Sequence, residues 1–336
     1  MRSRIEDVAA AAGVSMKTVS RVLNNEPNVR DEMRQRVMKA VEKLQYRPNL
    51  SARSLAGQRS YVIALVYNNP SRNYLMEIQS GMLDACRDSH YNLVLAPVGT
   101  PKQRKADDLK VVFEHFAPDG VVLIPPLTDD PAVIGFLEAQ DVPFSCIAPK
   151  HGEGRIGVMM DETAAVLELM QGLIGQGHRR IGHIKGPPSH GACHWRHKGY
   201  KDALRKAGIA FDPDLVVQGA FSFESGIEAA NALLDLPRPP TAIFAANDDM
   251  AAGVIRAACQ RGLVVPDDVS VCGFDDTPIA RHIYPALTTV RQPTSEMGKL
   301  ATLELLARIR TQGGGAMVHV EHQVLFREST RAPDPA

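Results

Sequence analysis

Four side chains of complementary chemistry lie where predicted strands end or a predicted helix begins. They are a carboxylate, a guanidinium, an amide and an aromatic ring: Asp275, Arg196, Asn247 and Phe221. A carboxylate accepts two hydroxyl protons, a guanidinium donates hydrogen bonds, and an aromatic ring packs against the C–H face of a sugar. This combination is typical of a site for a polyol, so the sequence predicts a sugar-like ligand.

Each of these four residues also has a purely structural interpretation. Asp275 could cap a following turn, and Asn247 could cap the helix after it, which is the common role of an asparagine there. Arg196 could form a surface ion pair, and Phe221 could belong to the core. The residue types alone leave both interpretations open.

The elements that would position these residues alternate between strand and helix after Tyr61. Apolar runs predict buried strands at Tyr61–Tyr67, Tyr91–Pro97, Gly120–Ile124, Phe144–Ala148, Arg180–Lys185, Leu215–Gln218, Ala242–Ala246 and Ser270–Phe274. Helices are predicted at Met76–Ser89, Arg104–His115, Ala164–Gly175, His197–Ala207, Phe223–Leu234 and Met250–Gln260. This alternation predicts doubly wound α/β units in two successive series, and ligands of such sheets bind beyond the carboxyl ends of the strands.

The first 59 residues differ from the rest in charge. They hold twelve Lys and Arg against six Asp and Glu. The remainder of the 336-residue chain holds 26 Lys and Arg against 32 Asp and Glu, so it is acidic. Apolar spacing predicts helices at Ile5–Ala12, Met16–Leu23 and Asp31–Leu44, with Gly13 as a left-handed cap and Ser15 as an N-cap. Asp31 is expected to cap the third helix, because Arg30 is a poor cap. Two short helices joined by a turn with glycine predict a helix-turn-helix motif, which suits a nucleic-acid-binding module.

Several classes of protein are excluded by composition. Five scattered cysteines without a CxxC pair predict neither a disulfide framework nor a structural zinc site. The histidines at 190, 194 and 197 suggest a metal site only weakly, because they fall in a predicted loop, and no metal or cofactor is expected. The N-terminus has no signal-peptide pattern and no apolar run is long enough to cross a membrane, so we expect a cytoplasmic, nucleoid-associated protein.

Two long motifs in the basic segment resemble one known family. The segment Asp7-Val-Ala-x-x-Ala-Gly-Val-Ser-x-x-Thr-Val-Ser-Arg-Val-Leu-Asn24 is similar to the DNA-binding segment of the lactose-repressor (LacI/GalR) family. So are Leu44-x-Tyr-x-Pro-Asn49 and Ala52-Arg-Ser-Leu-Ala-Gly57, and the resemblance continues to about residue 330. It implies a ligand-responsive transcriptional repressor.

The resemblance assigns roles to residues of the second helix. Met16, Lys17 and Arg21 stand at the positions that read bases in the major groove, where Lys and Arg donate to guanine and Met contacts a thymine methyl. Phosphate contacts are implied for Ser15, Thr18, Ser20 and Asn24.

The linker is implied to form a hinge helix on DNA. Asn49 would cap it, Ala52 lies within it, and Leu55 would insert into the minor groove as an apolar wedge. The alternative is an interdomain tether in which Leu55 packs on the core. The seven residues from Asn49 to Leu55 are too few for a stable isolated helix.

The implied core resembles periplasmic sugar-binding proteins. The predicted fold is therefore an N-terminal all-α helix-turn-helix domain (residues 1–46), a hinge helix and linker (47–59), an α/β core of two doubly wound subdomains (60–330) and a tail (331–336). The N-subdomain covers about 60–160 and 291–318, and the C-subdomain about 161–290 and 319–330. The chain is expected to cross between them near Asp161, Thr289–Arg291 and Val318–Val320.

The resemblance also bears on the ligand. Arg196, Phe221, Asn247 and Asp275 match the effector-contacting positions of the family, and we add Asn69, Tyr74 and Gln292. An Asp-Arg pair typical of the family after the fourth strand is replaced by Ala148-Pro-Lys150, so the effector can differ from the usual sugars, and a purine or a sugar phosphate stays open.

The predicted function is a repressor of carbohydrate-metabolism genes that binds pseudo-palindromic operator DNA as a homodimer. The tail carries no heptads for a tetramerising coiled coil. The alternatives are a cytoplasmic sugar-binding protein and a sugar-modifying enzyme with a DNA-binding regulatory domain. No nucleophile–base arrangement accompanies the acidic residues, so we expect no enzyme. The residues do not distinguish an inducer from a co-repressor.

Overall fold

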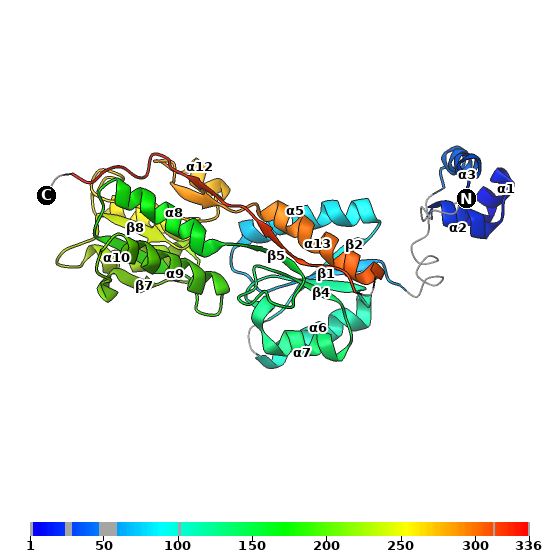
Figure 1. Ribbon diagram of the computed structural model, residues 1–336, viewed down its shortest axis with the longest axis horizontal. Coiled ribbons are helices and arrows are strands. Elements are labelled where there is room, and N and C mark those ends of the chain that lie inside the picture. The colour runs from blue at the N-terminus through cyan, green and yellow to red at the C-terminus, as the bar shows by residue number, and fades with distance from the viewer. Residues whose placement is uncertain (1–2, 24–28, 47–58, 100–101, 312, 335–336) are drawn as a thin grey trace. The chain divides into compact units, whose positions relative to one another are not determined.

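The computed structural model describes residues 3–23, 29–46, 59–99, 102–311 and 313–334. The chain divides into two compact units, residues 1–61 and 62–336 (Figure 1). Within the described residues, none of the helices combines the length and the hydrophobicity that a membrane crossing requires. The predicted class, a helical N-terminal module followed by an α/β core, is confirmed.

The first unit contains three helices, α1 (Ile5–Ala12), α2 (Met16–Leu23) and α3 (Asp31–Lys43). Their core is formed by small apolar residues, among them Val8, Val19 and Val37, all fully buried. α1 and α2 begin and end as the sequence predicts, and α3 begins at the predicted Asp31 but ends at Lys43, one residue before the predicted Leu44. Arg30 occupies the N-cap position and α3 begins at Asp31, so the prediction that Asp31 caps this helix is wrong. A carboxylate in the first turn still stabilises the helix through its dipole.

The turn between α1 and α2 depends on one glycine and one serine. Gly13 has φ of 63°, a left-handed conformation that glycine adopts without strain. Ser15 Oγ accepts a hydrogen bond from the Thr18 backbone N–H at 3.2 Å, which caps α2. Arg36 of α3 donates to the Ala12 carbonyl at 2.5 Å and ties the turn to the third helix. The helix-turn-helix geometry is therefore fixed locally.

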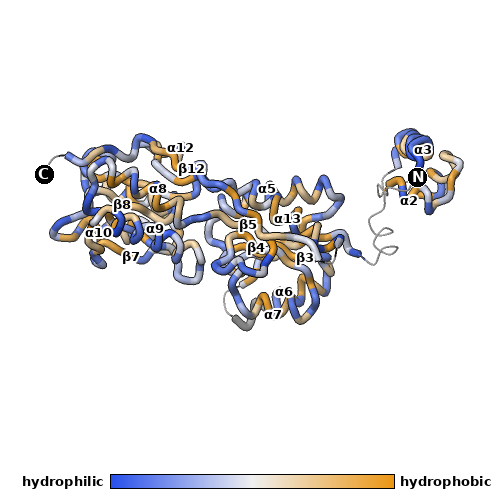
Figure 2. Tube along the Cα trace, in the orientation of Figure 1, coloured by the Kyte–Doolittle hydropathy of each residue, from blue (hydrophilic) through white to orange (hydrophobic). Residues whose placement is uncertain are grey.

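The second unit begins with a lobe built on six parallel strands in the order β11-β5-β4-β3-β1-β2. The strands are β1 (Val62–Tyr67), β2 (Asn92–Pro97), β3 (Gly120–Leu123), β4 (Phe144–Ile147), β5 (Gly157–Met160) and β11 (Met317–Val320). Its helices are α5 (Arg72–Ser89), α6 (Lys102–Phe116), α7 (Pro131–Ala139) and α13 (Thr294–Thr311), with a 3-10 turn η1 (Leu127–Asp129). β4 and β5 are hydrophobic in Figure 2, as expected of strands covered on both faces.

Helices cover both faces of this six-stranded sheet. α5 and α13 pack on one face and α6 and α7 on the other. Gly81 of α5 lies so close to α13 that a Cβ atom at this position would stand 1.7 Å from the Ser295 carbonyl oxygen. Gly298 of α13 approaches the Ile78 carbonyl in the same way. The two glycines allow these long helices to pack backbone against backbone.

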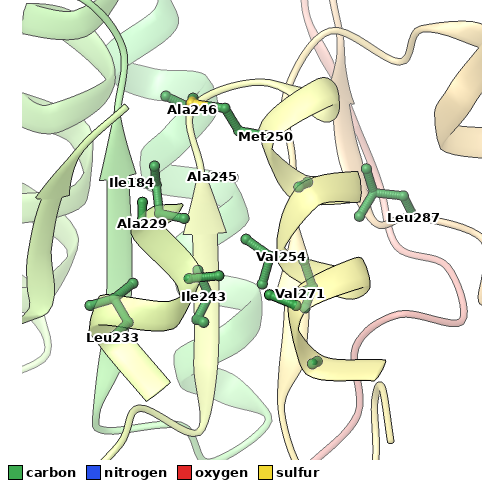
Figure 3. Packing of buried hydrophobic residues seen from close by; sticks show 14 of the residues in the cluster. Ile184, Ala229, Leu233, Ile243, Ala245, Ala246, Met250, Val254, Val271 and Leu287 are labelled. Carbon is green, nitrogen blue, oxygen red and sulfur yellow. The ribbon is translucent and has the colours of Figure 1, made fainter. Parts of the chain in front are cut away.

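The second lobe contains four parallel strands in the order β7-β6-β8-β9. The strands are β6 (Ile181–Lys185), β7 (Val216–Gln218), β8 (Ala242–Ala245) and β9 (Ser270–Cys272). Its helices are α8 (Glu162–Gly175), α9 (Gly191–Lys206), α10 (Phe223–Leu234), α11 (Asp248–Gln260) and α12 (Pro278–His282), with a 3-10 turn η2 (Pro213–Leu215). α8 and α9 cover one face, and α10 and α11 the other, where Ile243, Val254 and Leu233 interlock (Figure 3).

The two lobes are joined by three chain crossings. The first follows β5 and enters α8, the second leaves β10 (Thr289–Arg291) for α13, and the third leads from β11 to β12 (Gln323–Leu325). β10 and β12 form an antiparallel pair. Asp276 holds both segments, because its buried carboxylate accepts from Arg291 Nε at 2.7 Å and from Arg327 Nη2 at 2.5 Å. The crossings lie near the three places that the sequence predicts.

Some elements differ from the sequence-based prediction. The helix expected at His197–Ala207 begins at Gly191, so the segment interpreted as a loop before it is helical and Arg196 lies inside α9. The helix expected from Met76 begins at Arg72, where the Ser71 hydroxyl caps its first turn. Further elements were not predicted: α7, β5, α12, β10, α13, β11 and β12.

Candidate ligand-binding site

A pocket lies within the second unit where residues from both lobes meet at the carboxyl ends of their strands. Its empty space is about 420 Å³, part of it open to solvent. The lining residues are Asn69, Ser71, Tyr74, Pro125, Ala148, Glu162, His190, Ala192, Arg196, Phe221, Asn247, Asp275 and Gln292. The structure thus brings together all seven residues that the sequence assigns to the ligand. That they bind one stays a prediction.

Arg196 is the charged centre of the pocket. Its side chain is 5% exposed, and Nε donates to Glu162 Oε2 at 2.6 Å. Nη1 donates to the Ala246 carbonyl and lies 3.5 Å from Asp275 Oδ1. Burial alone would lower the pKa of Arg196, but the two carboxylates raise it overall. The alternative of a surface ion pair is therefore wrong, because this ion pair is buried.

The guanidinium is also supported by an aromatic ring. Its Cζ atom lies 3.7 Å from the centroid of the Phe274 ring, at the end of the strand region that leads to Asp275. Such a cation–π contact stabilises a desolvated cation. Packing and hydrogen bonds together fix the position of Arg196 before any ligand binds.

Asp275 has an unusual backbone conformation and a perturbed acid group. Its φ is 115°, in the left-handed region that a non-glycine residue rarely adopts. Oδ1 accepts a hydrogen bond from Gln292 Nε2 at 2.6 Å. Burial raises the pKa of this carboxyl to about 6, against the lowering effect of Arg196. Strain at a pocket-lining carboxylate is typical of functional sites.

Asn247 combines both of the roles considered for it. Its Oδ1 accepts from the Met250 backbone N–H at 3.0 Å, so it caps α11. Its Nδ2 donates to the Phe221 carbonyl at 3.1 Å and holds that loop in place. Phe221 has φ of 60° and is 8% exposed, and its ring occupies the space that a Cβ on Gly186 would need. Asn247 therefore positions the aromatic wall of the pocket.

The first lobe contributes an amide and a phenol. Asn69 Nδ2 donates to the Pro125 carbonyl at 3.1 Å, and Asn69 Oδ1 accepts from the Ser71 backbone N–H at 2.9 Å. Burial raises the pKa of Tyr74, and the carboxylates of Glu162 and Asp275 raise it further. Tyr74 is therefore a neutral hydroxyl at the pocket wall.

Sequence reasoning missed two polar residues of the pocket, Glu162 and His190. Glu162 is 5% exposed and is the first residue of α8, directly after the first crossing. An arginine buried in a pocket needs a charged partner, and this requirement is the signal that could have led to Glu162. His190 is 7% exposed and lies at the N-cap of α9, with its ring edge-on to Phe221.

The histidines considered as metal ligands make different contacts in the structure. His197 stacks on His183, and His194 packs edge-on against Trp195. Among the residues that the structure describes, no group of three His, Cys, Asp or Glu side chains is arranged to hold a metal ion.

The exposed face of α2 carries the residues assigned to base reading. Met16 is 51% exposed, and Lys17 and Arg21 are also exposed, whereas Val19 and Val22 face the core. Ser15 and Thr18 bond to each other at the start of the helix, and Ser20 is half-buried. The remaining residues assigned to DNA lie outside the described part of the chain: Asn24, Asn49, Ala52 and Leu55.

Comparison with known proteins agrees with this division of the chain. Residues 4–49 match the model described as "Bacterial regulatory proteins, lacI family". Residues 170–330 match the model of a periplasmic binding protein-like domain.

Single proteins are similar over nearly the whole length. Catabolite control protein A of Priestia megaterium is 33% identical over 335 residues, which cover 98% of this chain and all of that protein. The solved complex of the transcriptional regulator CelR with cellobiose is 33% identical, with a TM-score of 0.74 over 98% of this chain and all of that one. The lac repressor dimer bound to operator and the anti-inducer ONPF is 27% identical, with a TM-score of 0.79 over 99% of this chain and all of that one.

Proposed function

Because the chain belongs to the lacI family of bacterial regulatory proteins, we propose that it represses transcription from operator DNA in response to a small sugar-like effector. The observation that carries this proposal is the pocket between the two sheets, where a buried Arg196 meets two carboxylates and an aromatic ring. The named relatives are regulators, and one of them was solved with cellobiose. Genes of carbohydrate metabolism are the proposed targets.

The proposed DNA contacts come from α2 and the linker. Lys17 and Arg21 would donate to guanine edges and Met16 would contact a thymine methyl. Ser15, Thr18, Ser20 and Asn24 would bind phosphates. The linker, residues 47–59, would form a hinge helix in which Asn49 caps, Ala52 lies within the helix and Leu55 wedges into the minor groove. These contacts require two copies, so we propose a homodimer on a pseudo-palindromic operator, located with the nucleoid in the cytoplasm.

The proposed effector contacts are the seven residues assigned from the sequence. Asp275 would accept two hydroxyl protons, Arg196 and Asn247 would orient the ring oxygens, and Phe221 would pack against a C–H face. Asn69, Tyr74 and Gln292 would complete the contacts. Effector binding would change the angle between the lobes and thereby the geometry of the two hinge helices. By linkage, the factor by which the effector changes operator affinity equals the factor by which operator changes effector affinity.

A thermal-shift screen tests the effector site. Purified full-length protein is heated with mono- and disaccharides, sugar acids, sugar phosphates and purines. A ligand at 100 times its dissociation constant stabilises the folded state by about 2.7 kcal/mol. The proposal expects a hit that is lost in Asp275→Ala, a variant that should keep operator binding without ligand. A variant that still releases operator at the wild-type effector concentration contradicts the site.

A gel-shift titration tests the linker. Leu55→Ala should weaken operator binding and leave effector affinity unchanged, because it removes only the wedge. Equal operator affinity of variant and wild type contradicts the hinge assignment.

Sedimentation tests the homodimer. A monomer at micromolar concentration, with and without operator, contradicts it.

A second candidate function is a sugar-binding or sugar-modifying protein with a DNA-binding regulatory domain. The pocket and the periplasmic-binding-protein-like lobe are compatible with it. A turnover assay on each ligand found in the screen distinguishes the two, because a repressor returns its effector unchanged.

A further inference from the structure

The charges on the pocket wall are unequal. Three residues with full charges line it, and two of them, Glu162 and Asp275, are carboxylates against the single cation Arg196. All three side chains are at least nine-tenths buried, with exposed fractions of 6%, 10% and 5%. Solvent therefore screens these charges weakly.

The cation is already engaged by the protein. Arg196 donates to Glu162 and to the Ala246 carbonyl and faces Asp275, while its guanidinium stacks on Phe274. An incoming anion would have to compete with two fixed carboxylates for one guanidinium. Buried carboxylates left without a partner are costly, so such an exchange is unfavourable.

The field of the carboxylates is seen in their neighbours. Burial, together with the charges of Glu162 and Asp249, raises the pKa of Asp275 to about 6 against the lowering effect of Arg196. Burial raises the pKa of Tyr74, and the two lining carboxylates, Glu162 and Asp275, raise it further. The N-termini of α5, α9 and α11, whose N-cap residues Ser71, His190 and Asn247 line the pocket, oppose the carboxylates with partial positive charges.

His190 supplies a polar contact without charge. It is 7% exposed, and its buried Nε2 has no hydrogen-bond partner among the described residues. Burial and the charge of Arg196 hold the pKa of this imidazole at about 4, so the ring is neutral at pH 7. A buried nitrogen without a hydrogen-bond partner is costly unless a ligand or a water molecule satisfies it. His190 lines the pocket, so a bound ligand can supply that partner.

We propose that the pocket takes an uncharged, hydroxyl-rich ligand and excludes phosphorylated and carboxylated sugars, and that His190 Nε2 is one of the ligand's polar contacts. The inference rests on the proposed function and narrows its effector class. A polyol satisfies the site because its hydroxyls donate to Asp275 and accept from Arg196, and they can do either with a neutral imidazole. A phosphate or carboxylate can only accept, and it adds a negative charge beside two others.

Matched pairs of ligands test the class. Full-length protein is titrated calorimetrically at pH 7.5 with glucose and glucose 6-phosphate, ribose and ribose 5-phosphate, and galactose and galacturonate. Uncharged disaccharides, polyols and nucleosides are screened beside them. We expect a neutral ligand to bind, and its charged counterpart to bind at least tenfold more weakly. A charged sugar that binds as tightly as its neutral counterpart, or no binding by any uncharged ligand, overturns the inference.

Three variants test the cause. Glu162→Gln keeps an oxygen for Arg196 but removes one negative charge, so the preference for the neutral member of each pair should shrink. His190→Ala should weaken the neutral ligand at least tenfold. His194→Ala is the matched control, because His194 lies on the same helix and is exposed. Equal affinity in His190→Ala and His194→Ala overturns the contact, and unchanged selectivity in Glu162→Gln overturns the electrostatic argument.

A gel shift separates this inference from the proposed function. If a charged sugar releases operator, the repressor function stands and the ligand class is wrong. If the protein binds no operator while a neutral sugar binds the pocket, the ligand class stands and the repressor function is wrong.

Discussion

Replacing Arg196 with methionine should destabilise the second lobe, because Arg196 holds two carboxylates together inside the protein. The substitution removes the donor 2.6 Å from Glu162 and the cation 3.5 Å from Asp275. Methionine has a similar length and can still pack on Phe274, so the volume of the site changes little. What changes is the charge, since two buried carboxylates lose their only cation within the pocket wall.

The expected loss is about 3–5 kcal/mol, the usual cost of removing one partner of a buried ion pair. Replacing the pair together is much less harmful, because an apolar pair leaves no unmatched charge. The double variant Arg196→Met/Glu162→Met removes one of the two carboxylates and should therefore recover part of the loss, whereas Asp275 remains buried without its cation. The two substitutions are in contact, so their effects should not add.

Urea denaturation followed by tryptophan fluorescence measures these changes. The chain has one tryptophan, Trp195, which precedes Arg196 in α9 and reports on this lobe. Arg205→Met is the matched control, because that arginine lies on the same helix with its side chain 76% exposed, and it should change stability by less than about 1 kcal/mol. A single variant as stable as the control, or a double variant no more stable than the single, refutes the reasoning.

Three other substitutions give distinct results. His183→Phe should reduce acid sensitivity, because burial holds the pKa of His183 at about 3 against 6.5. The neutral ring stabilises the fold above pH 6.5, so the wild type should lose about 2 kcal/mol more than the variant between pH 7 and pH 5. Parallel urea midpoints at the two pH values contradict this. Gly186→Ala places a Cβ 2.1 Å from Phe221 Cζ, so calorimetry should find weaker ligand binding while gel shifts show unchanged operator affinity. Arg21→Ala should cost about 1–3 kcal/mol of operator binding, and a change in ligand affinity instead would argue against its role.

The sequence allowed prediction of those features that depend on local pattern. Apolar spacing placed α1 and α2 at their observed bounds, and Gly13 and Ser15 act at the turn as expected. The strands of the two sheets, except β5 and β11, were found because parallel strands are continuous apolar runs. Pocket residues such as Asn69, Asn247 and Asp275 were found because parallel strands end at one edge of a sheet, and the match to the effector positions of the family pointed to Arg196.

The remaining features depend on contacts between distant segments. Glu162 is a site residue only because Arg196, on the next helix, needs a carboxylate inside the protein. The start of α9 was missed because Pro187 and Pro188 suggest a loop, although the helix begins three residues later at Gly191. α13 was missed because many of its apolar residues face a sheet formed by the other end of the chain.

The position of α13 has a consequence for how the protein is made. The first lobe takes most of its strands from residues 62–160 but is completed by α13 and β11, between Thr294 and Val320. Most of the second lobe lies between these segments and leaves the ribosome before them. The glycine contact of α5 with α13 therefore joins segments that are synthesised more than 200 residues apart. Domains usually fold during synthesis from the N-terminus onward, but here the lobe that begins first must finish after the core of its neighbour. A chain that terminates before α13 would expose the apolar face of α5 and the sheet, and it would become a substrate for chaperones and proteases rather than a functional half-protein.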